Sequence, residues 1–397
     1  MTERPLSSAS PLAVSVIVAS HGNYHLARSR ALARVEGIEP SFIELVSGVK
    51  RSPWWTAERD LDRRVIRLAD SSYEEAPMRD IGRRLVRVLT QLQPEVIVIA
   101  GYSDLPMRTA AKWARRNRRG VVLCSETTGW DFKRRRWRES IKRMWIRRHI
   151  DAAVVGGQPH RDYAVKLGIE PERIWDRYDV VDNEYFSRRC DALRAEGSAA
   201  RIKAGLADNY FLYVGRFAPE KNLVTLLRAY RRYREENETP WSLVMVGDGP
   251  DRSYLLQVAR AEQIEGVIWA GSKQADELPL YYAFAGCFIL PSSLEPWGLV
   301  VNEAMASGLP VIASYRCGCA SDLVSDGCNG FVFDPGDVGQ LSQLMLQMGS
   351  KSLEQRCAMA QASRRMISGW SPENWAIQVA SAAHCAAQLQ ATARAFH

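Results

Sequence analysis

The stretch from Cys287 to Pro310, CFILPSSLEPWGLVVNEAMASGLP, constrains the fold more than any other part of the chain. Its first four residues form an apolar run, which is typical of a strand buried on both faces of a parallel sheet. Pro291 ends this run, and the pattern then predicts a helix over Leu299 to Ala306 that closes at Gly308. In open α/β sheets, ligands bind at the carboxyl ends of the strands. The loop between this strand and this helix is therefore the first candidate for a binding site.

The start of the predicted helix suits an anion, because the first N–H groups of a helix have no partner within it. Here these groups belong to Gly298, Leu299 and Val300, and a phosphate can approach Gly298 closely because glycine has no Cβ. Glu303 follows about 7 Å further along the axis, at 1.5 Å per residue, where a carboxylate suits the hydroxyls of a ribose. Glu295 precedes the helix and is free to reach the other half of such a ligand.

A second loop predicts the same ligand. Arg216 follows an apolar run over 211–214, and Lys221 lies in the first turn of a helix expected from Pro219 to about Glu236. Two cations beside a helix N-terminus match a diphosphate and need no metal ion. We therefore expect both cations to converge on one anion. Glycines follow this apolar run and the two after it, over 241–246 and 266–269, and they are Gly215, Gly247 and Gly271.

The pattern PSSxExxGLxxxEAMAxGxPVI, in which seven residues separate the two glutamates, resembles the donor-site signature of the retaining glycosyltransferases of family 4. The resemblance is strongest over about 205–335. It implies transfer of a sugar from a nucleotide-sugar, a UDP- or GDP-sugar, to an acceptor hydroxyl with retention at the anomeric carbon, in polysaccharide or glycoconjugate biosynthesis. The nucleotide-sugar is then a substrate, and neither a cofactor nor a metal ion is expected.

The resemblance also implies roles for the residues above. Glu295, Arg216 and Lys221 are the expected catalytic residues. The expected donor-binding residues are Gly215, Arg216, Lys221, Gly247, Gly271, Glu295, Gly298, Leu299, Val300 and Glu303.

The same resemblance implies the GT-B fold, an α/β architecture of two Rossmann-like parallel-sheet domains that face a cleft. The acceptor-side domain is expected over 1–190 and the donor domain over 205–370, with a linker at about 187–208 and a last helix, over 372–397, that crosses back to the first domain. Alternating strand and helix patterns in the first half favour a parallel sheet covered on both faces. Strands are predicted near 12–19, 42–47, 64–68, 95–100, 120–124 and 151–155, and helices near 22–36, 78–92, 104–117 and 135–149.

Loops at the carboxyl ends of the first-domain strands carry three acceptor-side candidates, His21, Asp104 and Glu126. His21 either contacts an acceptor or a phosphate, or is a loop histidine with structural partners. The two carboxylates either act on an acceptor hydroxyl or cap the next element. In many relatives a histidine of this domain contacts the transferred sugar, and no such histidine is placed in this sequence.

Residues 131–150, DFKRRRWRESIKRMWIRRHI, form the most basic run of the chain. At helical spacing Ile141, Trp145 and Arg148 share one face, and the other faces are largely cationic. The run resembles an interfacial helix that binds anionic lipid. The alternative is a domain helix whose apolar stripe packs on the sheet. No nucleic-acid-binding module accompanies the run, so the expected partners are a nucleotide-sugar, an acceptor (glycan, lipid-linked sugar or small molecule) and an anionic membrane surface.

The composition sets further limits. The net charge of +8 fits a nucleic acid, a membrane surface or an anionic substrate and selects none of them. Eight cysteines without a C-x-x-C pair argue against zinc and favour a cytoplasmic protein, and lipid binding by the basic run would make it peripheral at the inner face of the membrane. Asp60-Leu61-Asp62 lies in a charged segment that predicts a surface rather than a metal site. Residues 12–19 are too few to span a membrane and predict a first strand.

Three other functions remain open at this point. A nucleotide-sugar epimerase of the GT-B fold, or a sugar phosphorylase, shares the two-domain architecture, although no lysine stands in the setting that a phosphorylase's pyridoxal phosphate requires. A non-catalytic subunit would bind a nucleotide-sugar and transfer nothing. A basic nucleic-acid-binding protein would bind DNA or RNA with steep salt dependence and would bind no donor.

Overall fold

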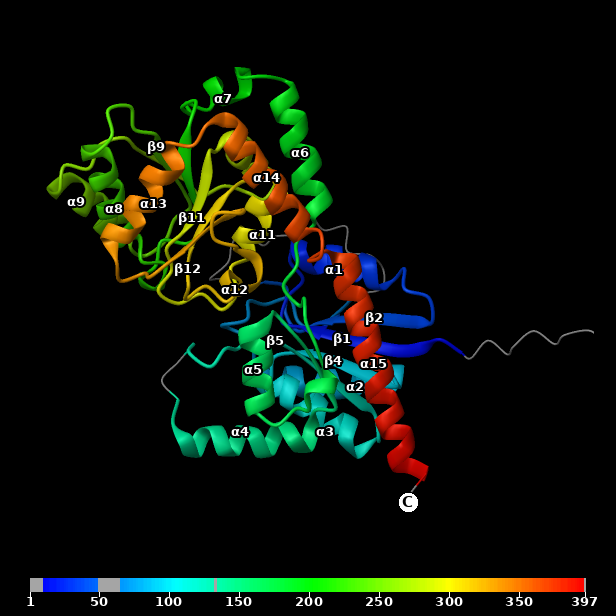
Figure 1. Ribbon diagram of the computed structural model, residues 1–397. Helices are drawn as coiled ribbons and strands as arrows, with labels where there is room; N and C mark the ends of the chain where they lie inside the picture. Colours follow the sequence, from blue (N-terminus) through cyan, green and yellow to red (C-terminus); the bar gives the residue numbers. More distant parts are fainter. Residues whose placement is uncertain (1–9, 49–64, 132–133, 396–397) are drawn as a thin grey trace, which may run out of the picture.

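The computed structural model describes residues 10–48, 65–131 and 134–395. These residues form two parallel β-sheets, each with helices around it, and Figure 1 shows the second sheet above the first. The Asp-x-Asp motif at 60–62 lies outside the described residues.

The first sheet has the strand order β3-β2-β1-β4-β5-β6-β7, and all of its pairings are parallel. Its central strands are apolar and almost wholly buried, as expected for a sheet with helices on both faces. The strands are β1 (Leu12–Val18), β2 (Ile38–Glu44), β3 (Val65–Arg67), β4 (Val96–Ala100), β5 (Gly120–Ser125), β6 (Ala152–Val155) and β7 (Ile174–Trp175). The helices are α1 (Asn23–Leu32), α2 (Met78–Leu92), α3 (Leu105–Arg116), α4 (Arg136–His149), α5 (Gln158–Lys166) and the short 3₁₀ helix Pro171–Arg173.

The second sheet has the order β10-β9-β8-β11-β12-β13 and is also parallel throughout. Its strands are β8 (Tyr210–Val214), β9 (Ser242–Val246), β10 (Val267–Gly271), β11 (Cys287–Leu290), β12 (Val311–Ser314) and β13 (Gly330–Phe333). The helices that follow the first sheet are α6 (Asn183–Ala195), α7 (Ala199–Lys203), the 3₁₀ helix Pro219–Lys221, α8 (Leu223–Glu235), α9 (Arg252–Ala261), α10 (Leu278–Phe284), α11 (Leu299–Ala306), α12 (Ala320–Leu323), α13 (Val338–Gly349), α14 (Leu353–Ile367) and α15 (Pro372–Ala395).

Each sheet reverses its strand order once, between β1 and β4 in the first and between β8 and β11 in the second. Loops that follow the two strands at such a point run in opposite directions and leave a crevice between them. In the second sheet, these loops are the ones that carry the predicted cations and glutamates. The topology therefore brings both predicted halves of the anion site to one place.

The last helix returns to the first sheet, as predicted. It contacts α1 and the strands β4 to β7, and Figure 1 shows it beside α1. Its buried face is rich in alanine, which lets the helix backbone approach the sheet closely. A Cβ added at Gly120 of β5 would lie 3.0 Å from the Cβ of Ala386. The predicted two-sheet α/β architecture with a helix that crosses back is confirmed.

The linker predicted at about 187–208 is helical over much of its length, in α6 and in α7. The Asp182 side chain accepts a hydrogen bond from the backbone N of Tyr185 at 2.9 Å and caps the start of α6. Phe186 and Cys190 are buried, and the helix packs against α10 and α11 of the second half. Of the charged residues that suggested a linker, Arg188 and Arg189 are exposed, whereas Arg194 donates to the backbone oxygens of Ala283 and Ser307, at 2.7 Å each.

The helix predicted from Pro219 is interrupted near its start. Pro219–Lys221 is a 3₁₀ turn, Asn222 has a left-handed backbone (φ 56°), and only then does α8 begin. The Asn222 side chain donates to the backbone oxygens of Pro291 and Pro335, at 3.1 and 2.8 Å. These bonds tie the turn that ends in Lys221 to the loop after β11.

The helix α4 packs differently from the prediction. Ile146 and His149 are buried, and the Trp145 ring stacks on His149 with centroids 4.7 Å apart, so Trp145 lies on the packed face. The exposed apolar residues are Trp137, Ile141 and Met144, with 57, 53 and 67% of their surface exposed. Figure 1 shows α4 at the lower edge of the molecule, far from the second sheet.

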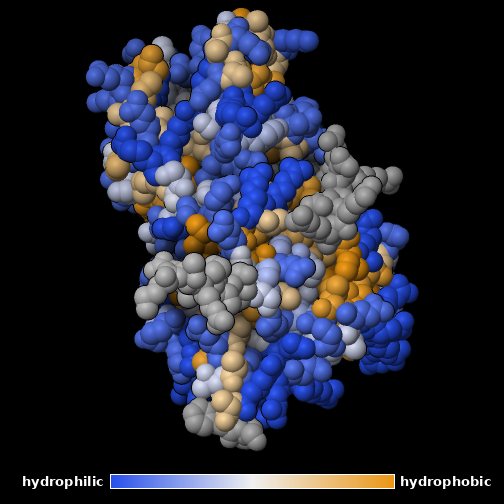
Figure 2. Space-filling model, turned by 90° about the vertical axis from the view of Figure 1, so that its right-hand side faces the viewer, coloured by the Kyte–Doolittle hydropathy of each residue, from blue (hydrophilic) through white to orange (hydrophobic). Residues whose placement is uncertain are grey.

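Hydrophilic residues cover most of the face shown in Figure 2, with apolar side chains in small groups between them. Among the helices of the described segments, none has both the length and the apolar character that crossing a membrane requires.

Candidate active site

The crevice of the second sheet holds the predicted lysine and glutamate in direct contact. Lys221 Nζ donates to Glu295 Oε2, and the two side chains are 18 and 11% exposed. The Ser292 hydroxyl donates to the same carboxylate oxygen at 3.1 Å. Arg216 lies on the same loop as Lys221, half-buried, and its backbone oxygen accepts from the Tyr213 hydroxyl at 2.9 Å. A basic loop and a carboxylate loop therefore meet, and the convergence of Arg216 and Lys221 on one anion stays a prediction.

Glycines allow these loops to come together. Gly215 and Gly247 have φ values of +153° and +137°, which L side chains rarely adopt, and a Cβ on Gly247 would lie 1.9 Å from the Gly215 oxygen. Gly247 N in turn donates to the Gly271 oxygen at 2.9 Å. The three predicted glycines thus lie together at the carboxyl ends of the neighbouring strands β8, β9 and β10.

The helix α11 begins at this crevice. Gly298 is its N-cap with a left-handed backbone (φ 107°), and Leu299 and Val300 form its half-buried first turn. A Cβ on Gly298 would lie 3.0 Å from Leu290 Cδ2 and 3.4 Å from Glu295 Cγ. The positive end of the helix therefore lies next to the carboxylate of the Lys221–Glu295 pair, in the arrangement that favours anions.

Glu303 lies one turn deeper and is 1% exposed. The Tyr282 hydroxyl donates to its Oε2 at 2.7 Å, and the Tyr24 hydroxyl, from α1 of the first half, donates to its Oε1. Burial raises the pKa of Glu303 to about 7, while the two phenol donors act in the opposite direction. Both carboxylate oxygens thus bind hydroxyl groups, which is the chemistry that the predicted ribose contact requires.

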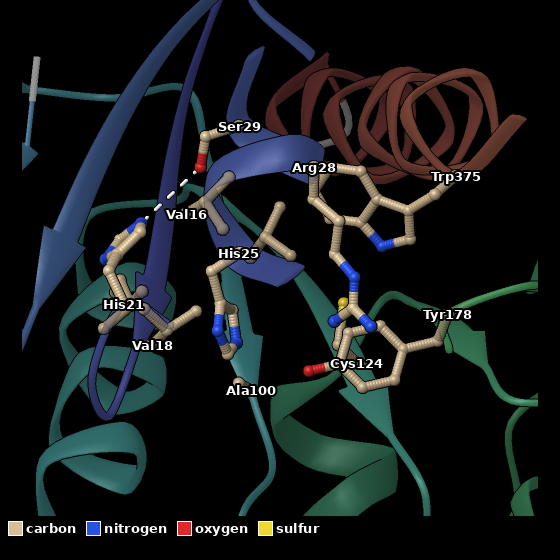
Figure 3. Close-up of a pocket in the computed structure, with 12 residues that line it drawn as sticks. Val16, Val18, His21, His25, Arg28, Ser29, Ala100, Cys124, Tyr178 and Trp375 are labelled. Atoms are coloured by element: carbon tan, nitrogen blue, oxygen red, sulfur yellow. Dashed lines mark hydrogen bonds between the residues drawn. The ribbon is translucent and has the colours of Figure 1, made fainter. Parts of the chain in front are cut away.

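His21, the first acceptor-side candidate, faces the interior of the first half. It is 5% exposed, its backbone N donates to Glu44 Oε2 at 3.0 Å, and burial lowers its pKa to about 4. It lines a small cavity of about 10 Å³, room for about one water molecule, together with His25 and Arg28 (Figure 3). These surroundings fit the structural alternative, and the acceptor-side role of His21 stays a prediction.

The two acceptor-side carboxylates lie apart from the Lys221–Glu295 pair. Asp104 precedes α3 and interacts with the Tyr73 hydroxyl, whose pKa is raised by burial and by this carboxylate. Glu126 is exposed at the end of β5 and lies near Asp179, a fully buried residue. Burial, and then the Glu126 charge, raise the pKa of Asp179 well above its usual range. Glu126 thus lies beside Asp179, whose backbone oxygen accepts from Asn302 of the second half.

Hydrogen bonds between the two halves surround the crevice. His160 of α5 contacts the backbone oxygen of Pro296 through Nε2 at 2.9 Å, and the Asn302 side chain of α11 donates to the backbone oxygen of Asp179 at 2.9 Å. The backbone N of Gln158 donates to Asp322 Oδ1 at 3.1 Å. The two halves therefore meet directly at the predicted site.

Sequence reasoning missed Tyr24 and Asp179. Tyr24 lies 279 positions from Glu303, and Asp179 lies 123 positions from Asn302. Contacts at such separations depend on how the two halves dock, and a single sequence carries no periodic signal for them. The only clue was that Tyr24 comes just after the loop that follows β1, because that loop was predicted to face the cleft. Within the described residues, no group of three or more His, Cys, Asp or Glu side chains is placed to hold a metal ion.

Residues 199–366 match the family model for glycosyl transferases group 1. The chain is 34% identical over 170 residues to the sulfoquinovosyl transferase SQD2 of Arabidopsis thaliana, covering 42% of this chain and 31% of that protein. It is 36% identical over 140 residues to the O-antigen chain mannosyltransferase B of Escherichia coli, covering 35% of this chain and 36% of that protein. The match thus spans about a third of the length of each relative.

The likeness of fold extends over nearly the whole chain. The crystal structure of Anabaena Alr3699/HepE in complex with UDP and glucose superposes with a TM-score of 0.69 at 17% sequence identity, covering 93% of this chain and 98% of that one. The sucrose-phosphate synthase of Thermosynechococcus elongatus superposes with a TM-score of 0.69 at 17% identity, covering 97% of this chain and all of that one. The chain therefore has the two-domain GT-B fold, and within it residues 199–366 match the glycosyl transferases group 1 family model.

Proposed function

We propose that the protein is a retaining glycosyltransferase that moves a sugar from a nucleotide-sugar to an acceptor hydroxyl in polysaccharide or glycoconjugate biosynthesis. The observation that carries the proposal is the meeting of Lys221 and Glu295 beside the start of α11 at the crevice of the second sheet. Similarity to a sulfoquinovosyl transferase and a mannosyltransferase supports a transferase, and the likeness to a protein solved with UDP and glucose supports a UDP- or GDP-sugar donor.

In this proposal the diphosphate binds between Arg216, Lys221 and the first turn of α11. These groups stabilise the negative charge that builds on the leaving phosphate oxygen as its bond to the anomeric carbon breaks. Two cations and a helix N-terminus supply the stabilisation that a metal ion provides elsewhere, so no metal is required. Glu295 binds the hydroxyls of the donor sugar, and Glu303 binds the ribose.

The acceptor oxygen attacks the anomeric carbon from the face that the diphosphate leaves, and the diphosphate takes the acceptor's proton. The new bond then forms on the same face as the broken one, which gives retention without a covalent enzyme intermediate. Closure of the two domains excludes water from this step. The acceptor belongs to a glycan, a lipid-linked sugar or a small molecule, and Glu126 is the acceptor-side carboxylate nearest to the cleft.

The proposal also places the protein in the cytoplasm, peripheral at the inner face of the membrane. The support for membrane contact is the outer face of α4. Trp137, Ile141 and Met144 recur at helical spacing and are more than half exposed. The cationic side chains of the same helix are Arg136, Arg138, Lys142, Arg143, Arg147 and Arg148. Apolar side chains within a cationic helix surface suit the interface of an anionic bilayer.

Donor binding tests the site directly. We would measure dissociation constants of UDP, GDP and ADP by calorimetry in the presence of a chelator. One nucleotide is expected to bind, and Lys221→Ala is expected to weaken it about tenfold or more, because a charge-assisted contact to phosphate is lost. Lys203→Ala, which removes an exposed lysine of α7, is the matched control and is expected to bind as the wild type does.

The results also separate the alternatives. Equal weakening in both variants would point to a general charge effect and would contradict the site. Normal donor binding without transfer would favour a non-catalytic subunit, and conversion of the donor into an isomeric nucleotide-sugar would identify an epimerase.

A further inference from the structure

A hydroxyl group from the first domain binds the carboxylate of Glu303, which in the proposed function binds the ribose of the donor. Tyr24, in the first turn of α1, donates to Glu303 Oε1 across the domain boundary. Tyr282, in the same domain as Glu303, donates to Oε2 at 2.7 Å. Each carboxylate oxygen of Glu303 thus accepts from one phenol, and the residue is only 1% exposed.

The ring of Tyr24 strengthens this contact. Tyr24 belongs to α1, but it packs against the apolar core of the second domain, which includes Tyr282 and Phe288. Burial, followed by the Glu303 charge, raises the pKa of Tyr24 well above its usual value, so the hydroxyl keeps its proton and acts as a donor. The phenol is therefore fixed on the carboxylate by packing and by a hydrogen bond.

A second contact joins α11 to the first domain, next to Glu303. Asn302, the preceding residue of α11, donates through its side-chain amide to the backbone oxygen of Asp179 at 2.9 Å. The face of α11 that carries Glu303 and Asn302 is thus the one on which the first domain closes. A ribose that reaches Glu303 has to enter where Tyr24 now lies.

We propose that, in the free protein, the Tyr24 hydroxyl takes the place of a ribose hydroxyl on Glu303 and is displaced when the nucleotide binds. This proposal rests on the proposed function, because it requires Glu303 to bind ribose. A phenol and a ribose hydroxyl are both O–H donors to a carboxylate, so one can replace the other without leaving the buried carboxylate unpaired. Displacement of Tyr24 also separates α1 from α11, so donor entry is coupled to opening of the domains.

The proposal has a quantitative consequence. A nucleotide that must displace Tyr24 binds only the fraction of molecules in which Tyr24 is released, and its apparent dissociation constant rises by the inverse of that fraction. Loss of one hydrogen bond to a carboxylate changes such an equilibrium by roughly tenfold or more. Removing the hydroxyl is therefore expected to tighten donor binding, whereas removing an ordinary binding residue would weaken it.

The test compares Tyr24→Phe with wild type and with Tyr282→Phe in the full chain. Both variants remove one hydroxyl from Glu303 and keep an aromatic ring, but only Tyr24 bridges the domains. We would measure the dissociation constants of UDP and GDP by calorimetry, and amide hydrogen exchange of α1 and α11 without nucleotide. Tyr24→Phe is expected to bind the nucleotide about tenfold more tightly and to exchange faster at both helices. Tyr282→Phe is expected to show neither tighter nucleotide binding nor faster exchange.

Two results overturn the proposal, and they are distinguishable. If wild type binds a nucleotide and Tyr24→Phe binds it equally or more weakly, the role of Tyr24 is wrong while the proposed function stands. If wild type and both variants bind neither nucleotide, the proposed function fails, and the role of Tyr24 as a substitute for ribose fails with it.

Discussion

At the scale of single residues, Glu303 makes the stability of the protein depend on pH. Burial raises its pKa from 4.5 to about 7, so the folded protein holds this proton more tightly than the unfolded chain does. This proton contributes on the order of 3 kcal/mol to the free energy of unfolding. The contribution is fully present below about pH 4.5 and is lost as the pH rises through about 7. Glu303→Gln, which stays neutral, is expected to lose this dependence.

Denaturant unfolding of both proteins between pH 5 and 8 checks this expectation. As the pH rises, the free energy of unfolding of wild type should fall relative to that of Glu303→Gln, by an amount on the order of 3 kcal/mol. A difference that is constant over this range would show that the carboxylate titrates normally, and the account of its burial between Tyr24 and Tyr282 would be wrong.

Gly247 is the residue on which the loop geometry depends most. A Cβ there would lie 1.9 Å from the Gly215 oxygen, and its φ of +137° is strained for any L side chain. Gly247→Ala is expected to lower the free energy of unfolding by about 2 kcal/mol or more and to weaken nucleotide binding. Gly129→Ala, where a Cβ meets nothing within 4 Å and φ is not positive, is the matched control and should change neither quantity.

At the scale of elements, α15 depends on its small residues. Ala386 is fully buried, and its Cβ lies 3.0 Å from the position of a Cβ on Gly120 of β5. Ala386→Leu is expected to destabilise the protein by about 1 to 3 kcal/mol because this contact has no room for a larger side chain. Gln388→Leu, on the exposed side of the same helix, is expected to be neutral. Thermal or denaturant unfolding compares the two, and equal effects would contradict the packing described.

The outer face of α4 makes a separate prediction. A triple change of Trp137, Ile141 and Met144 to serine is expected to reduce binding to vesicles that contain phosphatidylglycerol by tenfold or more, because each exposed side chain loses its burial in the bilayer. Wild type should bind poorly to vesicles of phosphatidylcholine alone and less at high salt.

A matched triple change of exposed apolar residues elsewhere, Ile202, Leu353 and Ile377 to serine, is the control for α4 and should bind as wild type does. Cosedimentation with vesicles measures all three proteins. Equal binding by wild type and the α4 variant would rule out this helix as the membrane contact.

At the scale of the whole molecule, the sequence predicted what depends on local pattern and on sheet topology. Lys221 and Glu295 meet because each follows a strand that adjoins the crevice, and strand order in a parallel sheet places such loops together. Which apolar residues of α4 pack and which are exposed was not predicted, because this depends on neighbours such as Tyr102 that periodicity does not reveal.

The contacts between the domains could not be predicted in the same way. The Tyr24–Glu303 bond joins residues from two separately folded sheets, and only their docking brings the residues together. The helical structure of the linker region was not predicted for a related reason: α6 is held by Phe186 and Cys190, which pack against elements that follow much later in the chain.

The most direct test of the central claim is turnover of a donor. We would incubate the protein with UDP-, GDP- and ADP-sugars, without acceptor or metal, and measure release of free nucleotide from wild type, Lys221→Ala and Lys203→Ala. We predict slow release from one donor, lost in Lys221→Ala and kept in Lys203→Ala. Absence of release together with absence of binding of any of the three nucleotides would contradict the assignment of the crevice as a nucleotide-sugar site.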